Sequence, residues 1–299
     1  MARARLIVPI TGVGYAGLAS AVVAELPRLT DRDRLLLDLL ADHATLTTDQ
    51  ITDLAFGSAG RARIRLNILH ERGVLDRFRH YQRAGSQSWR WTLGPLGAAI
   101  VATRRGEPIP RPALVRDRTA RLANSPTLGH RIGVNGFFVA LAAHARHAPG
   151  VRLARWWNEA RATEAAGDIV RPDGHGLWVD NGRAVPFWLE YDTGTERPLS
   201  RVADKLPGYA RLSGTRWSLP VLLWLPTAVR EANLHAHLRR TGVPAGVTVA
   251  TASADHAAGH GGPTGPVWQR PGHPERVTLA QLPAPHGRPA PGDPTPWDG

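Results

Sequence analysis

A short apolar run that ends in acidic residues constrains the fold of this chain more than any other stretch. Val185–Leu189 is apolar and β-prone, Glu190 and Asp192 follow it, and Thr193–Thr195 is typical of the loop that ends a strand. Residues two apart in a strand share a face, so both carboxylates are expected to point the same way. The stretch therefore predicts a strand that brings two acids to one place.

A third carboxylate comes from an earlier run. Pro172-Asp173 closes the β-prone residues Asp168–Arg171, and if the two strands pair, Asp173 meets Glu190 and Asp192. Three carboxylates repel one another unless a hard cation sits among them, and Mg²⁺ takes such oxygen ligands. The pattern predicts a Mg²⁺ or Mn²⁺ site formed by these three acids.

Lys205 adds a separate signal, because it is the single lysine among the 37 basic residues and all the rest are arginine. Arginine presents a planar fork that is always charged, whereas lysine is a compact point charge whose pKa shifts readily. A lysine retained here favours a chemical role near the acids. The alternative is a lysine that lies by chance on a solvated helix face.

These segments resemble the PD-(D/E)xK nuclease-like superfamily, in which an Asp follows a Pro and an acid-x-Lys lies on the next strand. From about Leu29 to about Leu282 the chain also resembles the actinobacterial replication-relaxation proteins of plasmids and other mobile elements. That resemblance rests on Leu29–Asp33, Pro172-Asp173, Glu190–Asp192 and Lys205-Leu206. It implies a winged helix joined to a nuclease-like domain and a role in plasmid replication or mobilisation.

The resemblance also implies a metal-dependent DNA endonuclease with Asp173, Glu190, Asp192 and Lys205 as catalytic residues. Asp173 and Glu190 would hold the metal, Asp192 would be a third ligand or a base, and Lys205 would hold the nucleophile or the developing charge. The chain departs from the pattern in one respect, because the strand lysine of the superfamily would fall at Asp192. Lys205, on the following helix, is the candidate replacement.

Composition indicates a polyanionic partner. The 299 residues suffice for two domains, the net charge is +12 and the isoelectric point is about 11.3. These values favour double-stranded DNA, although GC-rich coding would also raise the arginine content. The absence of cysteine excludes disulfides, thiolate zinc sites and cysteine nucleophiles, and with a DNA partner it indicates the cytoplasm.

Residues 29–106 predict a winged helix. Thr30 caps a first helix, Thr47 or Thr48 caps a second, and a third runs from Ala59 to Glu71 before Gly73. Two strands around a Gly85-Ser86 turn follow. In the third helix the apolar residues Ile64, Ile68 and Leu69 are expected to face inward, with Leu66 close to that face.

The arginines of this region are the predicted DNA contacts. The third helix would enter the major groove, and the hairpin would meet phosphates. The residues predicted to contact DNA bases are Arg61, Arg63 and Arg65. The residues predicted to contact phosphates are Arg79, Arg83 and Arg90. The alternative is a winged helix used for protein contacts, with these arginines on a solvated face.

The rest of the chain predicts a second, α/β domain. A long helix at 126–148 precedes strands at 151–157, 169–179 and 185–192. A helical region at 199–212, broken at Pro207, then precedes a buried strand at 219–225, a helix at 228–240 and a strand at 247–251. This order predicts an α/β sandwich with a mixed sheet, α+β overall. The predicted boundaries are 1–28 for an N-terminal arm, 29–106 for the winged helix, 107–124 for a linker, 125–285 for the nuclease-like domain and 286–299 for a disordered tail.

The N-terminal apolar residues, 6–23, have several interpretations. They match a short signal peptide, and Gly12–Gly17 after a strand-like run fits a dinucleotide fingerprint. The helix predicted next, rather than a second parallel strand, argues against the fingerprint. Pro9 and the glycines argue against a membrane span. An arm that packs on the first domain, or lies outside its core, is the preferred interpretation.

Two further functions stay open. In one, the winged helix locates a DNA site and the acidic domain is a non-catalytic remnant that recruits a relaxase or a replication protein. In the other, the chain is a transcription regulator with a ligand-sensing α/β domain. The second gives no reason for a carboxylate cluster.

Overall fold

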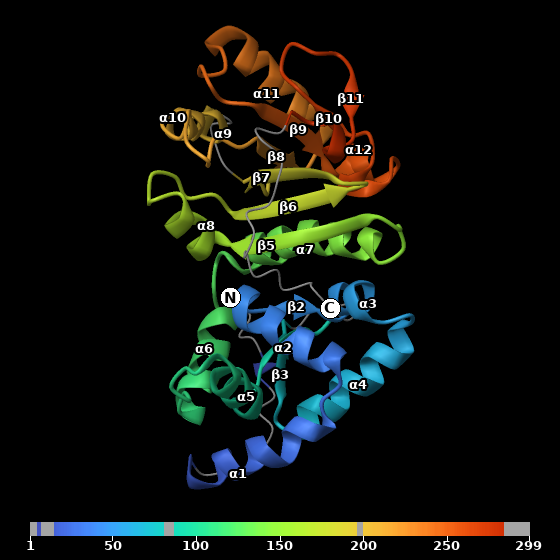
Figure 1. Ribbon diagram of the computed structural model, residues 1–299, viewed down its shortest axis with the longest axis vertical. Coiled ribbons are helices and arrows are strands. Elements are labelled where there is room, and N and C mark those ends of the chain that lie inside the picture. Colours follow the sequence, from blue (N-terminus) through green and yellow to red (C-terminus); the bar gives the residue numbers. More distant parts are fainter. Residues whose placement is uncertain (1–4, 7–14, 81–86, 196–199, 284–299) are drawn as a thin grey trace. The chain divides into compact units, whose positions relative to one another are not determined.

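The computed structural model describes residues 5–6, 15–80, 87–195 and 200–283. The chain divides into two compact units, unit 1 (Met1–Asn135) and unit 2 (Gly136–Gly299), and the division falls inside helix α7 (Leu128–Ala145). Both units combine helices with strands (Figure 1), which confirms the predicted α/β, α+β overall, class. The predicted tail, 286–299, and most of the fingerprint stretch, 12–14, lie outside the described residues.

Unit 1 contains helices around a four-stranded sheet of order β1-β3-β4-β2. Its elements before α7 are β1 (Arg5–Leu6), α1 (Tyr15–Glu25), α2 (Asp31–His43), β2 (Leu46–Thr47), α3 (Thr48–Ala55), α4 (Ala59–Glu71), β3 (Leu75–Arg79), β4 (Arg90–Leu93), α5 (Pro95–Arg105) and α6 (Pro112–Ala123). Three helices followed by a hairpin are the elements predicted for residues 29–106. The strand β2, between α2 and α3, pairs with β4.

Helix starts in unit 1 follow the local sequence. The Thr30 hydroxyl accepts from the Asp33 backbone N–H, and the Asp33 carboxylate accepts from the Thr30 N–H, which is a capping box. Thr47 and Gln50 form the same arrangement at α3. Short polar patterns therefore define where these helices begin.

The prediction for the inward face of α4 is wrong in one residue. The side chains buried on this helix are Ala62, Leu66, Leu69 and His70, which recur at helical spacing. Ile64 is 65% exposed, because it lies two residues from both Ala62 and Leu66 and so points away from their stripe. The outer face of α4 thus carries Ile64 between arginines.

Two segments outside the predicted winged helix also belong to unit 1. Helix α1, within the predicted arm, buries Leu18 and Val22 and contacts α5. The predicted linker is largely helix α6, which contacts α5 and β3. Unit 1 is accordingly larger than its three helices and hairpin.

Unit 2 is built on a seven-stranded mixed sheet of order β11-β10-β9-β8-β7-β6-β5. Strands β7, β8 and β9 run parallel, and the other pairs are antiparallel. Its elements after α7 are β5 (Val151–Asn158), α8 (Glu159–Ala165), β6 (Gly174–Asp180), β7 (Arg183–Tyr191), α9 (Ser200–Ala203), α10 (Leu206–Ala210), β8 (Val221–Leu225), α11 (Ala228–Thr241), β9 (Val249–Ser253), α12 (Ala254–Ala258), β10 (Trp268–Gln269) and β11 (Arg276–Val277).

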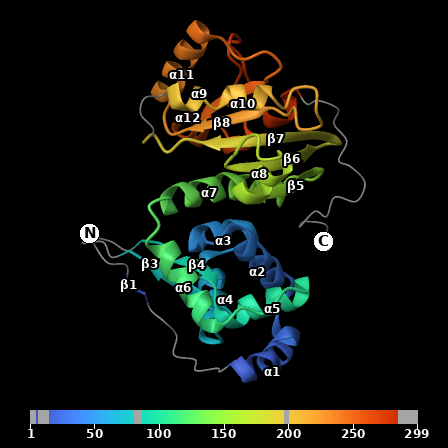
Figure 2. The same cartoon turned by 90° about the vertical axis from the view of Figure 1, so that its left-hand side faces the viewer.

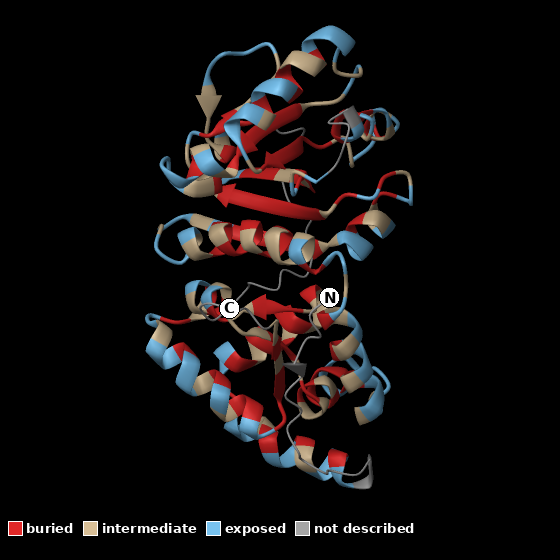
Figure 3. Ribbon diagram, turned by 180° about the vertical axis from the view of Figure 1, so that it is seen from behind, coloured by how far each residue is buried: buried red, intermediate tan, exposed pale blue. Residues whose placement is uncertain are grey.

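Helices cover both faces of this sheet (Figure 2). On one face, Phe137 and Phe138 of α7 contact the rings of Phe187 and Trp156. On the other, side chains of α8, α9, α10 and α11 share one core cluster with Trp188. Every residue of β8 and β9 is buried (Figure 3), as expected for parallel strands covered on both faces.

Two local predictions in unit 2 can be compared directly with the structure. The second strand begins at Gly174, so Asp173 lies before the strand and not at its end, which corrects the sequence interpretation. The helical region 199–212 is broken as expected, with Pro207 in the first turn of α10. No helix in the described ranges is long and apolar enough to cross a membrane.

Candidate functional site

Pairing of β6 with β7 brings Asp173 beside Glu190. The strands are antiparallel with Gly174 opposite Leu189, so the start of β6 meets the end of β7. The Asp173 N–H donates to the Leu189 carbonyl at 2.9 Å, and Asp173 Oδ2 accepts from the Tyr191 N–H at 2.7 Å. Antiparallel pairing thus brings together two acids that are distant in the sequence.

Glu190 binds Lys205 and Tyr209 with its two carboxylate oxygens. Its Oε2 accepts from Lys205 Nζ at 2.5 Å, and its Oε1 accepts from the Tyr209 hydroxyl at 2.5 Å. Glu190 is only 3% exposed, whereas the Lys205 side chain is 39% exposed. Both partners come from the crossover after β7, so Lys205 reaches the acids as predicted, although α9 ends before it and the helix is interrupted there.

The electrostatics of this cluster follow from burial. Burial raises the pKa of Glu190 to about 7, the Asp173 carboxylate adds to the rise, and Lys205 opposes it. Burial and the Glu190 carboxylate also raise the pKa of Tyr209 well above its usual value. The raised pKa of Glu190 is thus the balance of burial and the Asp173 charge against the bound Lys205.

Asp192 has a different environment from Asp173 and Glu190. Its carboxylate forms an ion pair with Arg230 Nε, accepts from Arg230 Nη2 at 3.1 Å, and accepts from the Gly194 N–H at 2.8 Å. The side chain is 4% exposed, and that of Arg230 is 16% exposed. This two-point ion pair joins the end of β7 to the first turn of α11.

The structure reduces the predicted three-acid metal set to two. Within the described ranges, no group of three or more His, Cys, Asp or Glu side chains is arranged to hold a metal ion. Asp173 and Glu190 remain a pair of oxygen donors, and Mg²⁺ is commonly held by one or two carboxylates with the rest of its shell from water and phosphate. Asp173 and Glu190, beside Lys205, are therefore the residues that could hold a single Mg²⁺ or Mn²⁺.

The arginines predicted to read bases have two environments. Arg61 and Arg63 are exposed on the outer face of α4. Arg65 forms a forked pair with the buried Asp33, through Nε to Oδ1 at 3.0 Å and Nη2 to Oδ2 at 2.5 Å. The charge of Arg65 is therefore paired with Asp33 within unit 1. Arg61 and Arg63 remain as the two arginines of this set that face outward.

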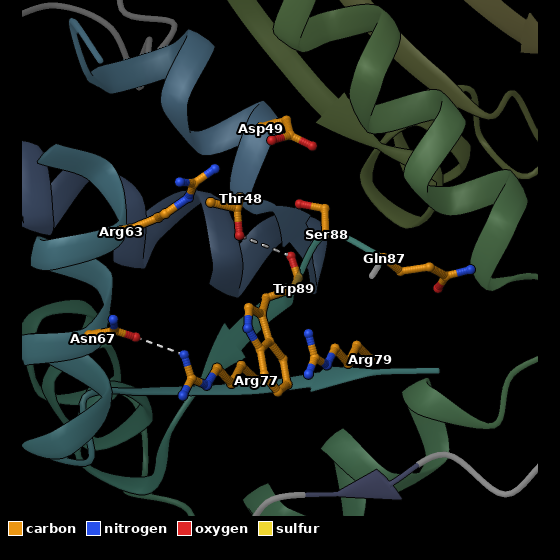
Figure 4. Close-up of a pocket in the computed structure, with 9 residues that line it drawn as sticks. All are labelled: Thr48, Asp49, Arg63, Asn67, Arg77, Arg79, Gln87, Ser88 and Trp89. Atoms are coloured by element: carbon orange, nitrogen blue, oxygen red, sulfur yellow. Dashed lines mark hydrogen bonds between the residues drawn. The ribbon is translucent and has the colours of Figure 1, made fainter. Parts of the chain in front are cut away.

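A hollow of about 510 Å³ lies between α4, the N-terminus of α3 and the hairpin (Figure 4). Arg77 and Arg79 of β3 lie on the Trp89 ring, each with its Cζ 4.3 Å from the ring centroid. Arg77 also donates to Asn67 Oδ1 at 2.7 Å. The nine lining residues are Thr48, Asp49, Arg63, Asn67, Arg77, Arg79, Gln87, Ser88 and Trp89.

This hollow concentrates positive charge. Burial, with the neighbouring Arg79, lowers the pKa of Arg77, but a guanidinium stays protonated at neutral pH. Arg63, Arg77 and Arg79 outnumber the single acid, Asp49. Hydroxyl and amide donors complete a surface that matches a phosphate group.

The arginines predicted on the hairpin also differ. Arg79 lines the hollow, Arg90 donates to Gln87 Oε1 at 2.8 Å beside it, and Arg83 lies outside the described residues. Arg77 and Trp89 are not among the residues predicted from the sequence. A signal for Arg77 is nevertheless present, since residues two apart in a strand share a face and Arg79 is a predicted contact.

Comparison with known proteins identifies a family. A family model described as replication-relaxation matches residues 37–221, which is more than half of the 299 residues. No curated protein and no solved structure matches the chain. The matched residues include the hollow, Asp173, Glu190 and Lys205.

Proposed function

Because the chain belongs to the replication-relaxation family, we propose that it is a DNA-binding protein of plasmid or mobile-element replication, relaxation or mobilisation. Membership supports a role in the replication or relaxation of mobile elements and an interaction with DNA or replication machinery. In this proposal, unit 1 is a winged helix that binds double-stranded DNA. Its α4 enters the major groove, and the hairpin holds the adjacent phosphates.

The observation that carries this proposal is the hollow that joins α4 to the hairpin. Arg63 comes from the helix, and Arg77 and Arg79 come from β3, so one cationic surface spans both DNA-contacting parts of a winged helix. Stacking on Trp89 holds the two β3 arginines in place before any ligand arrives. Such pre-ordering lowers the entropy lost on binding.

Titration of a fluorescent DNA duplex with the full chain tests this proposal. Arg63→Ala combined with Arg79→Ala is expected to weaken binding at least tenfold, because two cations that face phosphates are removed. Arg104→Ala combined with Arg105→Ala is the matched control, since those two arginines pair with Asp38 and Asp42. If both double variants lose the same duplex affinity, binding depends on the net charge of the chain and not on the hollow.

A metal-dependent nuclease in unit 2 is the second candidate function, favoured by the Asp173–Glu190–Lys205 cluster. A bound Mg²⁺ or Mn²⁺ would supply Lewis-acid stabilisation of phosphate charge and a more acidic water. Asp173 and Glu190 would hold the ion, and Lys205 would orient a phosphate oxygen. Asp192, already paired with Arg230, would brace β7 rather than bind the ion.

Incubation of supercoiled plasmid with and without Mg²⁺ or Mn²⁺ tests the nuclease. Metal-dependent nicking that Asp173→Ala and Lys205→Ala abolish would support it. Asp180→Ala, at the far end of β6, is the control and should cut normally. If the wild type neither cuts nor gains thermal stability from the metal, the nuclease is excluded in favour of a binding module that recruits a relaxase or a replication protein.

A further inference from the structure

Two exposed arginines of unit 2 lie over tryptophan rings close to the Asp173–Glu190–Lys205 cluster. The Cζ of Arg161 is 4.7 Å from the centroid of the Trp157 ring, and that of Arg216 is 5.0 Å from the Trp217 ring. Both arginines are exposed, Trp217 is half-buried and Trp157 is buried. A guanidinium that lies on an aromatic ring still presents its other planar face to solvent.

The rings beneath these arginines form one continuous layer. The centroids of Trp157 and Trp217 are 5.9 Å apart, and each ring also contacts His175, at 4.8 and 5.8 Å. His175 in turn lies 4.9 Å from Trp188, and neither of these two side chains is exposed. The layer is therefore anchored in the core through His175 and Trp188.

Strand register places this layer next to the carboxylates. His175 is opposite Trp188, Asp173 lies two residues before His175, and Glu190 lies two residues after Trp188. Two residues along a strand correspond to about 7 Å on one face of the sheet. Trp188 and Tyr209 also belong to one core cluster, against which Trp217 packs.

The surroundings of the layer are cationic. Arg155 is buried, with its Cζ 4.7 Å from the Trp157 centroid and its Nη1 3.3 Å from His175 Nε2. Burial and the nearby Arg161 charge both lower the pKa of Arg155. Two guanidinium groups close to one ring raise the positive potential there, which favours an anion at the exposed Arg161.

We propose that Arg161 on Trp157 and Arg216 on Trp217 form a binding site for single-stranded DNA, in which an unpaired base stacks on a guanidinium–tryptophan pair. A duplex hides the faces of its bases, whereas a single strand offers them, and flat cationic stacks bind such strands without sequence preference. The phosphates beside the stacked base would lie near the carboxylate cluster. This goes beyond the duplex binding assigned to unit 1.

A single strand of roughly ten nucleotides that contains 2-aminopurine tests the site in the full chain, because stacking quenches the fluorescence of that base. The wild type is expected to quench it. Arg161→Ala with Arg216→Ala should abolish the quenching and lower the affinity about tenfold. The matched control is Arg239→Ala with Arg240→Ala, two exposed arginines at the end of α11, which should leave the quenching unchanged.

Arg161→Lys with Arg216→Lys separates stacking from charge. It keeps both charges but removes the planar groups, so the quenching should fall while the salt dependence of binding stays. The inference is overturned if the wild type does not quench, if the alanine pair still quenches fully, or if the control pair weakens quenching as much. Duplex affinity measured on the same proteins reports separately on unit 1. Failure of the single-strand site in unit 2 is therefore distinguishable from failure of duplex binding by unit 1.

Discussion

The candidate sites of the two units differ in what surrounds their charges. In unit 1, Arg63, Arg77 and Arg79 line an open hollow whose volume is about 510 Å³. In unit 2, Glu190 is 3% exposed and binds side chains with both carboxylate oxygens. An open cation costs the fold little and can bind a ligand directly, whereas a buried acid is part of the fold. Mutations should therefore separate binding from stability in the hollow of unit 1 but not at Glu190 in unit 2.

The largest effect is expected at Asp192. Asp192→Ala removes a buried, two-point ion pair with Arg230, so the unfolding free energy should fall by about 4 kcal/mol. Chemical denaturation measures this fall. The double variant Asp192→Ala, Arg230→Ala should be destabilised by less than the sum of the single changes. Additive effects would mean that the ion pair does not couple β7 to α11.

A pH effect of about 3 kcal/mol is expected from Glu190, whose pKa rises from 4.5 to about 7 on folding. A raised pKa in the folded state means that its stabilising contribution is full below pH 4.5 and is lost as the pH rises through about 7. Glu190→Gln should therefore remove a fall in unfolding free energy that the wild type shows over this range. Glu164→Gln, an exposed acid in the same unit, should leave that fall in place.

The hollow of unit 1 should give a binding effect with little change in stability. Arg63→Ala, Arg77→Ala and Arg79→Ala combined are expected to weaken duplex binding about 100-fold. The slope of log affinity against log salt should decrease by about 0.9 for each phosphate that the variant no longer neutralises. Binding isotherms at several salt concentrations provide both numbers. An unchanged salt slope would mean that phosphates bind elsewhere on the chain.

The smallest effect is expected at Ile64, which is 65% exposed on the outer face of α4. Ile64→Ala should change the unfolding free energy by less than about 0.5 kcal/mol. Leu66→Ala, two residues away but fully buried, should cost about 2–5 kcal/mol. Similar destabilisation at both positions would show that α4 is rotated relative to the orientation described.

Local patterns were sufficient to predict most elements. The threonine caps of α2 and α3, the stop at Gly73 and the apolar strand β8 all follow from neighbouring residues, so their positions could be read from the sequence. The inward face of α4 could not, because its arginines alternate with Ala62, Ile64 and Leu66, and several rotations of the helix bury some apolar residues. Packing against the rest of unit 1 selects the one that buries Leu66 and Leu69.

The sequence was sufficient to predict which residues come close together at the site, but not which side chains form ion pairs. The sequence predicted that Asp173, Glu190 and Asp192 meet if their strands pair, and that the lone lysine, Lys205, acts near them. Pairing of β6 with β7 places Asp173 beside Glu190, and Lys205 binds Glu190. It did not predict that Asp192 would pair with Arg230 or that Arg65 would pair with Asp33. Such partners are brought together only by tertiary packing, and an arginine-rich chain offers many equivalent candidates.

The mixed sheet of unit 2 has a consequence for the order of folding. Strands β5, β6 and β7 pair antiparallel with neighbours close in sequence, while β7, β8 and β9 pair in parallel across longer crossovers. Local pairings close shorter loops and form faster, so hydrogen-exchange protection should reach the antiparallel strands first during refolding. Glu190 lies on the strand shared by both halves, and Lys205 and Tyr209 lie in the crossover that the parallel pairing draws in. The two acids therefore meet in the faster, antiparallel half, and Lys205 and Tyr209 join Glu190 only when the slower half of the sheet has docked.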